Sequence, residues 1–487
     1  MPLLSKSAAL TGLRCHKALW WQIHEPDAPE LRPDDILLDR FDQGKEVGRL
    51  AREHISGGVM IGTPFISMTE RIALTRREIQ AGTTLLYEAA FEADGVSVLV
   101  DILERKPRGF NLIEVKQSTS VKAAHIPDAA IQVHVARRAG LDLPTAELMY
   151  LNRACRYPDL SNLFLRQDIT ADVEALLPLF PAAISQLPSV IAGTLPDVAI
   201  GDHCSKPDDC PFMERCWPPL PRYHISTLYA LGAKMRGRLE EMDADTIDRI
   251  PDDFSLGEVR KRQRQAVVTG RRIVEPTLAA ALTTLREPLA FLDFETVARA
   301  VPVWPGCAPW EQVPAQLSCH VRSADGSVAH HEWLAQGAGD PRRPIAEALI
   351  DACRPAEVVV AYNASFEKGC IDRLASALPD LAAPLLAIAG RLVDLLPIVR
   401  NHVYEPAFDG RFGLKAVAPA LVPELSYQDL EIASGGEATL GLVRLLLTTD
   451  VLDDEERRRL RRQLLAYCER DTWCLVRLLD RLQELAG

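Results

Sequence analysis

No run of apolar residues in the sequence approaches the roughly 20 that are needed to span a bilayer as a helix. The longest runs, such as AELMYL at 146–151 and LLPLFPAAI at 176–184, fall well short of that length. The N-terminus also lacks a basic segment followed by a sustained apolar one, which a secretory signal requires. We therefore expect a cytoplasmic protein with no membrane span.

An excess of basic residues is also missing. Lys and Arg number 55 against 67 Asp and Glu, which gives a formal net charge of -12. A chain with this balance does not bind phosphate backbones by bulk electrostatics. Local basic segments remain, and KMRGR at 234–238 and VRKRQRQ at 259–265 are candidates for a path along nucleic acid.

Cysteine is present, but not in the pattern of a small disulfide-bonded domain. Eleven cysteines, an odd number, are spread over 487 residues, which argues against a disulfide framework and leaves metal ligation open. With 47% hydrophobic and 25% charged residues, the chain can bury large cores, and its length suggests two or three domains.

Changes in pattern divide the sequence into three regions. Residues 1–220 contain strand-like alternations and end in the stretch HCSKPDDCPFMERCWPPLPR, which is typical of a loop at a domain edge. Residues 221–286 are helical and strongly charged in pattern and are predicted to be a helical connector. In residues 287–487 apolar strands alternate with amphipathic helices, which is typical of an α/β fold. His330, His331 and His402 fall in predicted loops and receive no role.

The first set of chemically suggestive residues lies in VSVLVDILERKPRGFNLIEVKQS at 96–118. Two β-rich runs flank the turn residues of KPRGFN, so a hairpin is predicted. The hairpin would bring Asp101 beside Glu114, and the two-residue period of a strand puts Glu114 and Lys116 on one face. Two carboxylates and an ammonium suit a hard cation and the hydrolysis of a phosphodiester. The alternative is that E-x-K is an ordinary surface pair and Asp101 faces solvent.

This set resembles the PD-(D/E)XK nucleases of the RecB type. The resemblance implies a restriction-endonuclease-like fold in which Asp101 and Glu114 bind Mg²⁺ or Mn²⁺ and Lys116 orients or activates water. It also implies that Gln132, in the segment IPDAAIQVHVARRAG, is the glutamine of the helix that follows the hairpin. Glu88 is a candidate for an auxiliary acid.

Four cysteines accompany this region: Cys204, Cys210 and Cys216 follow it, and Cys15 lies far upstream. Their spacing does not fit the short C-x2-4-C pairs of zinc sites, whereas four thiolates can hold an iron-sulfur cluster. The arrangement resembles the iron-sulfur clasp of AddB-type helicase-nucleases and of CRISPR-adaptation nucleases related to RecB. That resemblance implies a 4Fe-4S cluster that pins the two ends of the nuclease domain together. Buried thiols without a ligand are the alternative.

A second set begins in PLAFLDFET, where a buried apolar strand carries Asp293 and Glu295 on one face. Glu367 follows the apolar run VVVA, and Tyr467 and Asp471, four residues apart, share one face of a C-terminal helix. Four acids and a tyrosine suffice for two-metal phosphoryl chemistry, in which the tyrosine positions the attacking water. Taken singly, each acid is more simply a solvated residue at the end of an element.

In this order the motifs D-x-E, N-x-x-F-acid and Y-x3-D resemble the DEDDy branch of the DnaQ-like exonucleases, which have an RNase H-like fold. The resemblance implies 3′ to 5′ exonuclease activity, binding of Mg²⁺ or Mn²⁺ by the four acids, and orientation of water by the tyrosine. In these exonucleases the third acid is usually aspartate. Asp394 is therefore a second candidate beside Glu367.

Two functions from different classes remain open. The chain is either a two-centre nuclease, with DNA bearing single-stranded ends as the expected substrate and repair or defence as the setting, or a non-catalytic binding or scaffold protein built on decayed nuclease folds. Lys116 and Tyr467 favour the first, because neither is needed for folding, whereas Glu367 and the acidic balance favour the second. Over nearly its whole length the chain also resembles a bacterial group of RecB-family nucleases whose C-terminal domain has no assigned function.

Overall fold

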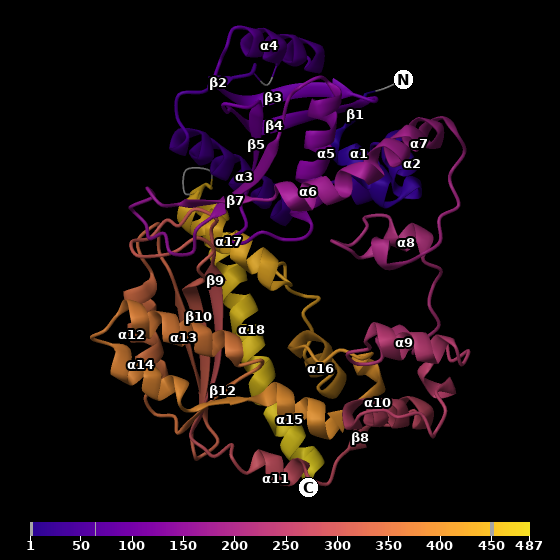
Figure 1. Cartoon of the computed structure of the whole chain (residues 1–487). Helices are drawn as coiled ribbons and strands as arrows, with labels where there is room; N and C mark the ends of the chain where they lie inside the picture. The colour runs from indigo at the N-terminus through magenta and orange to yellow at the C-terminus, as the bar shows by residue number, and fades with distance from the viewer. Residues whose placement is uncertain (1–2, 64, 449–451) are drawn as a thin grey trace. The chain divides into compact units, whose positions relative to one another are not determined.

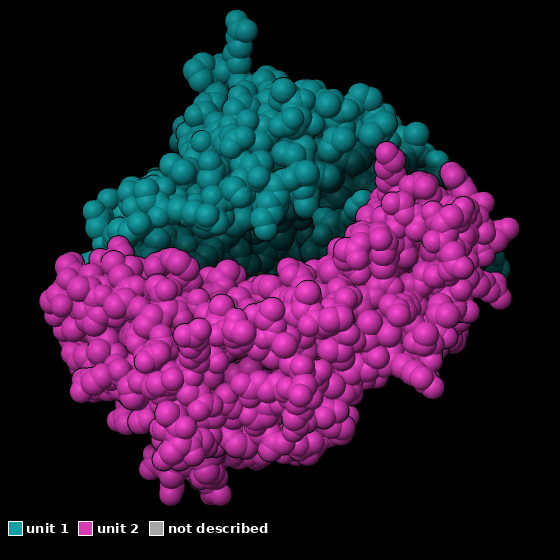
Figure 2. All heavy atoms as spheres, turned by 90° about the horizontal axis from the view of Figure 1, so that it is seen from below, with its two compact units in different colours: residues 1–218, 299–311 teal, residues 219–298, 312–487 magenta. Residues whose placement is uncertain are grey.

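The chain forms two compact units in the computed structural model, which describes residues 3–63, 65–448 and 452–487 (Figures 1 and 2). Unit 1 comprises Met1–Pro218 and Arg299–Glu311, and unit 2 comprises Pro219–Ala298 and Gln312–Gly487. Each unit contains a mixed β-sheet with helices, so the expected α/β class is confirmed. The segment predicted as a connector belongs to unit 2.

The sheet of unit 1 has seven strands in the order β2-β3-β4-β5-β6-β7, and β1 pairs with β4. Pairing is antiparallel from β3 through β5 and between β6 and β7, and parallel between β5 and β6. The strands are β1 (Leu4–Ser5), β2 (Val59–Met60), β3 (Leu85–Ala93), β4 (Val96–Arg105), β5 (Phe110–Lys116), β6 (Thr145–Leu151) and β7 (Phe164–Asp168).

Helices pack against both faces of this sheet. Val47 of α3 shares a hydrophobic cluster with Ile102 and Ile113 on one face, and Val133 of α5 shares another with Val98 and other residues of the opposite face. The helices are α1 (Lys6–Arg14), α2 (His16–His24), α3 (Asp35–His54), α4 (Met68–Gln80), α5 (His125–Arg138), α6 (Thr170–Leu176), α7 (Phe180–Ala192) and α8 (Met213–Cys216), with 3-10 turns η1 (Pro29–Leu31), η2 (Leu177–Leu179) and η3 (Asp202–Cys204).

The predicted hairpin over 96–118 is confirmed as β4 and β5. Their ladder runs from Arg105 opposite Phe110 to Ile102 opposite Ile113. Since side chains alternate along a strand, the residues that flank this last pair project toward α5. The pattern alone was sufficient here because each strand carries continuous β-branched and aliphatic residues around a glycine turn.

The segment Arg299–Glu311 between two strands of unit 2 is assigned to unit 1. Arg299 donates to Asp39 Oδ1 at 2.7 Å, and the Ala300 N–H donates to Gln43 Oε1 at 2.7 Å. Trp310 donates its ring N–H to the Gln117 carbonyl at 2.6 Å. The predicted third region, residues 287–487, therefore includes a segment that packs with unit 1.

The sheet of unit 2 has five strands in the order β11-β10-β9-β12-β13. The pairs β11–β10 and β10–β9 are antiparallel, whereas β9–β12 and β12–β13 are parallel. The strands are β9 (Leu289–Val297), β10 (Val313–Arg322), β11 (Val328–Leu334), β12 (Val358–Ala361) and β13 (Leu392–Asp394), and a separate pair is formed by β8 (Ile273–Val274) and β14 (Val403–Tyr404).

One face of this sheet packs on α12, α13 and α14, and the other packs on the long helix α18, drawn in yellow beside β9 and β10 in Figure 1. The helices are α9 (Ala233–Glu240), α10 (Glu258–Thr269), α11 (Leu278–Leu282), α12 (Arg342–Cys353), α13 (Ser365–Ala377), α14 (Ala382–Ala389), α15 (Leu395–His402), α16 (Leu414–Leu421), α17 (Gly435–Leu447) and α18 (Asp454–Ala486), with 3-10 turns η4 (Ile225–Thr227), η5 (Ile247–Arg249) and η6 (Pro406–Phe408).

The basic segment VRKRQRQ lies on α10, where three of its arginines serve packing. Arg262 is 5% exposed and pairs with Glu275 at 2.8 Å. Arg260 donates to the Tyr229 carbonyl at 2.7 Å, and Arg264 donates to the Ile250 carbonyl at 2.8 Å. The prediction that this segment follows a nucleic-acid strand is therefore wrong for Arg262, because a buried, paired guanidinium is not available to phosphates.

One stretch, Thr170–Ala192, is long and apolar enough to cross a membrane by length and composition alone, with 17% of its most apolar window buried. The sequence analysis expected no such stretch. In the structure it comprises α6 and α7, joined by the 3-10 turn η2. Phe180, Ile184 and Leu187 of α7 pack in the hydrophobic core of unit 1.

Candidate functional site

Three acidic side chains predicted to bind metal meet on one face of the unit 2 sheet. Asp293 and Glu295 come from β9 and Asp471 from α18, and one carboxylate oxygen from each lies within 4.8 Å of the others. Glu295 is 8% exposed and Asp471 is 7% exposed. Asp471 is far from the other two acids in the sequence, and the fold brings the three carboxylates together, as the motifs predicted.

The strand β9 places its two acids by simple alternation. Leu292 and Phe294 face the core formed with α12, α13 and α14, so Asp293 and Glu295 must face the opposite side. There they lie opposite Ser318 and Gln316 of β10, on the face that α18 covers. The apolar pattern of the strand thus determines which way the acids point.

Glu367 joins this set from the first turn of α13. It is 4% exposed, and its Oε2 atom is buried without a hydrogen-bond partner among the described residues. Burial raises the pKa of Glu367 to about 7, and its charge raises the pKa of Asp293. Asp394 instead caps α15, because its Oδ1 accepts the N–H groups of Asn363 at 2.9 Å and Leu396 at 3.0 Å. The charge of Glu367 acts on Asp293, whereas Asp394 is engaged in the cap, so Glu367 is the better candidate for the third acid.

The carboxylates of this set raise one another's pKa. Burial raises the pKa of Asp293 and of Glu295 well above the ordinary range, and the charge of Asp471 raises both further. Burial also raises the pKa of Asp471, although Tyr427 and Lys415 lower it in part. Clustered acids with too little positive charge around them are the environment that divalent cations neutralise. Their all-oxygen donor set fits Mg²⁺ or Mn²⁺.

Tyr467 lies beside the acids and is held by a lysine that the sequence analysis did not identify. Lys415 Nζ of α16 donates to Tyr467 Oη at 2.7 Å and lies 4.5 Å from the centroid of its ring. Tyr427 Oη donates to Asp471 Oδ1 at 2.5 Å. Neither Lys415 nor Tyr427 belongs to a local motif, so only the tertiary structure reveals them.

A cavity of about 580 Å³ opens beside these residues. Asp293, Asp471 and Lys415 line it together with aromatic side chains, among them Tyr229 and Phe412. Carboxylates for metal, an ammonium for phosphate and aromatic rings for base stacking are the groups that a site for single-stranded nucleic acid uses.

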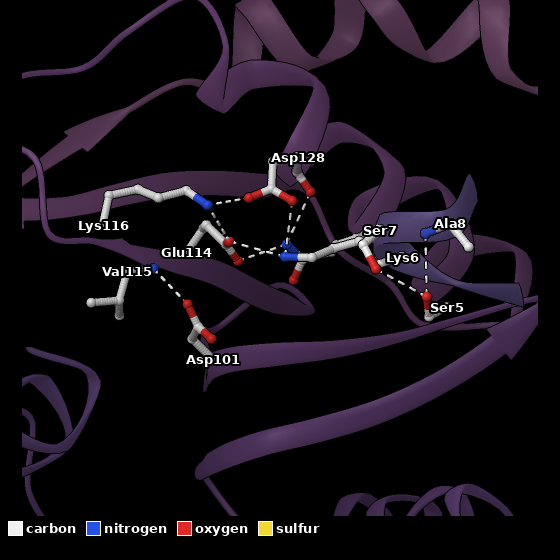
Figure 3. A network of polar contacts seen from close by, with 10 residues as sticks. Ser5, Lys6, Ser7, Ala8, Asp101, Glu114, Val115, Lys116 and Asp128 are labelled. Atoms are coloured by element: carbon white, nitrogen blue, oxygen red, sulfur yellow. Dashed lines mark hydrogen bonds and ion pairs between the residues drawn. The ribbon is translucent and has the colours of Figure 1, made fainter. Parts of the chain in front are cut away.

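In unit 1 the residues predicted for the first centre also meet (Figure 3). Lys116 Nζ lies 2.8 Å from Glu114 Oε1, and Gln132 Nε2 of α5 donates to Glu114 Oε2 at 2.6 Å. Asp101 Oδ2 accepts the N–H of Val115 at 2.7 Å, just beyond the end of the β4–β5 ladder. Burial, and after it the charge of Glu114, raise the pKa of Asp101 to about 8, although Lys6 opposes the shift.

Two further charged residues that the sequence analysis missed complete this network. Lys6 of α1 reaches between two acids, 3.1 Å from Glu114 Oε1 and 2.9 Å from Asp128 Oδ1, as Figure 3 shows. Lys116 also pairs with Asp128. Burial lowers the pKa of Lys6, but Glu114 and Asp128 outweigh that effect and raise it. Unlike the acids of unit 2, Glu114 is therefore already neutralised by protein cations.

Glu88, the candidate auxiliary acid, lies on β3 near this network. Burial raises its pKa, while the charge of Arg52, 3.4 Å away, lowers it in part. Its φ of 56° is left-handed, a conformation that costs a non-glycine residue on the order of 1–3 kcal/mol and is found most often at functional sites. Its charge also contributes, after burial and Glu114, to the raised pKa of Asp101.

The four predicted cysteines line a single cavity of about 150 Å³ in unit 1. Burial raises the pKa of Cys216, and the neighbouring Cys15, Cys210 and Cys204 raise it further, whereas Lys17 lowers it. Four thiols that line one cavity are a ligand set that a metal ion or an iron-sulfur cluster can use.

The raised pKa of Glu367 predicts that metal stabilises the protein more at high pH. Glutamate in an unfolded chain ionises near pH 4.3, whereas burial raises the pKa of Glu367 to about 7. Between these values the folded protein holds a proton that the unfolded chain has lost, so the metal-free protein loses stability as the pH rises. Mg²⁺ at the carboxylates offsets this loss.

Thermal melting should therefore show a larger gain on adding Mg²⁺ at pH 8 than at pH 5. In Glu367→Gln the metal-free protein should lose less stability over the same range, because one of the ionising groups is gone. Equal Mg²⁺ gains at both pH values in the wild type would contradict the assignment of these acids as a metal site.

Comparison with known proteins gives limited matches. A family model described as a domain of unknown function (DUF2779) matches residues 290–413, a range that includes Asp293, Glu295 and Glu367 and ends before Tyr467 and Asp471. No curated protein matches the chain. Among solved structures, the family B DNA polymerase from the hyperthermophilic archaeon Pyrobaculum calidifontis is similar at 16% identity over 39% of this chain and 24% of the polymerase chain, with a TM-score of 0.26. None of these matches names a RecB-type nuclease, a DnaQ-type exonuclease or an iron-sulfur protein.

Proposed function

We propose that the chain is a metal-dependent nuclease with two active centres that hydrolyses phosphodiester bonds in DNA. Unit 2 would be an RNase H-like domain of the DnaQ type with 3′ to 5′ exonuclease activity, and unit 1 a PD-(D/E)XK domain of the RecB type. The observation that carries the proposal is the convergence of Asp293, Glu295 and Asp471 beside Tyr467, with Glu367 near enough for its charge to act on Asp293. Four acids with raised pKa values and a tyrosine have no evident structural purpose at one point of a core.

In unit 2 the four acids would hold Mg²⁺ or Mn²⁺. When bound, these ions make water a better nucleophile and stabilise the charge that develops on the attacking and leaving oxygens. Lys415 donates to Tyr467 Oη, and Tyr467 hydrogen-bonds Asp471, so the phenol is held beside the acids, where its O–H would orient the attacking water once metal occupies the carboxylates. Tyr427 also donates to Asp471 Oδ1 and fixes that carboxylate.

In unit 1 Asp101 and Glu114 would hold the metal, and Lys116 would orient water and balance the negative charge that forms on the phosphate. Gln132 keeps Glu114 in place through its hydrogen bond to Oε2. Asp128 holds the Lys116 ammonium in the same network. Each residue of the sequence motif therefore has a neighbour that fixes its position.

Cys15, Cys204, Cys210 and Cys216 would hold a 4Fe-4S cluster, which would tie the N-terminal helices to the segment that precedes unit 2. Cys210→Ser should abolish the brown colour and the absorption at about 400 nm that iron-sulfur thiolate centres give, and should lower the melting temperature. Cys155→Ser is the matched control, because Cys155 is buried in the same unit but does not line the cavity. A colourless wild type that contains zinc after anaerobic purification would refute the cluster.

End-labelled single-stranded and double-stranded DNA and RNA, offered with Mg²⁺ or Mn²⁺ to the anaerobically purified chain, test the proposal as a whole. We expect shortening of single-stranded DNA from its 3′ end, and loss of all activity with EDTA. A wild type that cuts none of these substrates under any of these conditions would leave the nuclease proposal without support.

A second candidate function is supported by Lys6. Because Lys6 and Lys116 both pair with Glu114, the centre of unit 1 is electrically satisfied without a metal. Unit 1 would then be a nucleic-acid-binding or scaffold unit built on a decayed nuclease fold. The two candidates differ in whether Lys116 is needed for cleavage or only for binding.

A further inference from the structure

A cluster of two histidines and a glutamate lies in unit 2, outside the carboxylate set. His320 is on β10, His330 is its direct partner on the antiparallel strand β11, and Glu469 is on α18. One ligand atom from each of the three lies within 4.8 Å of the others. Paired residues of antiparallel strands project from the same face, and α18 packs on that face. Three separate elements therefore supply one set of ligands.

The hydrogen bonds around the two rings use one nitrogen of each histidine. Thr472 Oγ1 lies 2.9 Å from His320 Nδ1, and Ser318 Oγ lies 2.9 Å from His330 Nε2. The two hydroxyls are 2.7 Å apart and link the rings. The rings stack with their centroids 4.4 Å apart, and these hydrogen bonds leave His320 Nε2 and His330 Nδ1 outside the network, as is usual for the metal-binding nitrogen of a histidine ligand.

The remaining nitrogen of His330 faces the glutamate. His330 Nδ1 lies 3.8 Å from Glu469 Oε1, and the His330 and Glu469 side chains are 22% and 51% exposed. His320 is 5% exposed, so the cluster runs from the core to the surface and its open end can be reached from solvent.

We propose that His320, His330 and Glu469 bind a divalent transition-metal ion of the Zn²⁺ class. Two imidazoles and one carboxylate are a ligand set that zinc uses, with water in the fourth position, whereas Mg²⁺ prefers oxygen ligands alone. The ion would tie the edge strand β11 to α18, the helix that carries Tyr467 and Asp471. The site differs in ligand chemistry from the carboxylate set, and it does not rest on nuclease activity.

Calorimetric titration of the metal-free, full-length protein with Zn²⁺ tests the site. The wild type is compared with His330→Gln and with His331→Gln. His331 is the next residue on β11, pairs with Cys319 and points to the opposite face, so it is a matched control. We expect the wild type and His331→Gln to bind one equivalent of Zn²⁺ more than His330→Gln. Zinc held by the four cysteines contributes equally to all three proteins.

Co²⁺ gives a second readout, because nitrogen and oxygen ligands produce a visible spectrum different from that of thiolates. The part of the Co²⁺ spectrum due to nitrogen ligands should disappear in His330→Gln and persist in His331→Gln, while the contributions of the thiolates and of the carboxylate set stay the same in both. Glu469→Gln, at an exposed position, should weaken Zn²⁺ binding at least 10-fold and decides the matter if His330→Gln does not fold. Equal stoichiometry and affinity in the wild type and in the folded variants would overturn the proposal.

Discussion

Asp293→Asn is expected to abolish the 3′ to 5′ exonuclease activity that we propose for unit 2. The substitution keeps the size of the side chain but removes a charge that lies within reach of Glu295 and Asp471. Loss of one metal-binding carboxylate should lower the rate by about 10³-fold or more, which corresponds to roughly 4 kcal/mol of transition-state stabilisation. The measurement is the release of nucleotides from 3′-labelled single-stranded DNA in saturating Mg²⁺.

The melting temperature of Asp293→Asn shows whether the variant loses activity because it no longer binds metal or because it no longer folds. Burial and the charge of Asp471 raise the pKa of Asp293, so its ionised form is unfavourable in the metal-free protein. Asp293→Asn should therefore melt at the same temperature as the wild type or higher at pH 8 without metal, and gain less from Mg²⁺. Asp372→Asn is the control, because Asp372 forms a half-exposed pair with Lys368 on α13. Wild-type exonuclease activity in Asp293→Asn would show that this centre is not catalytic.

The sequence predicted the parts of both centres that depend on local periodicity. Alternation along β9 places Asp293 and Glu295 on one face, and the helical repeat places Tyr467 and Asp471 on one face of α18. These geometries follow from the period of a strand and the period of a helix, which are properties of short segments. The hairpin of β4 and β5 was predictable for the same reason.

Site residues that depend on contacts between distant parts of the chain could not be predicted from the sequence. Lys6 and Glu114 are 108 residues apart, and Lys415 meets Tyr467 across 52 residues, so no local pattern contains either pair. His330 was placed in a loop, whereas it lies on β11 opposite His320. The strand β11 is exposed along most of its length, and a polar edge strand lacks the apolar alternation from which strands are recognised.

In residues 221–286, predicted as a helical connector, the sequence led to the opposite error: residues that hold the fold were predicted to bind a ligand. A basic run such as VRKRQRQ reads as a surface that attracts phosphates, because charged side chains are usually exposed. Arg262 is buried instead, since Glu275 neutralises it and the Arg400 carbonyl accepts from its guanidinium at 2.9 Å. Charge in a sequence therefore does not reveal whether a residue binds a ligand or holds the fold. Only the partners found in the structure decide between these roles.

Lys116 could likewise serve either catalysis or the fold. Its substitution is the second change from which we expect a large effect. In an Asp293→Asn background, which removes the activity of unit 2, Lys116→Ala should lower the remaining metal-dependent cleavage by at least about 10²-fold. Lys122→Ala, an exposed neighbour after β5, should leave it unchanged. The measurement is endpoint and kinetic analysis of cleavage of internally labelled DNA.

The fold of unit 1 should survive the loss of Lys116, because Lys6 still neutralises Glu114 and Asp128. Removing one partner of a buried pair is severe only when the other charge is left alone, and here it is not. Lys116→Ala should therefore retain its melting temperature to within a few degrees while cleavage is lost. Two outcomes would contradict a catalytic role for unit 1: cleavage in the Asp293→Asn background that survives Lys116→Ala, or no cleavage in that background at all. Unit 1 would then be a binding unit, in which the two lysines neutralise Glu114 permanently and no metal replaces them.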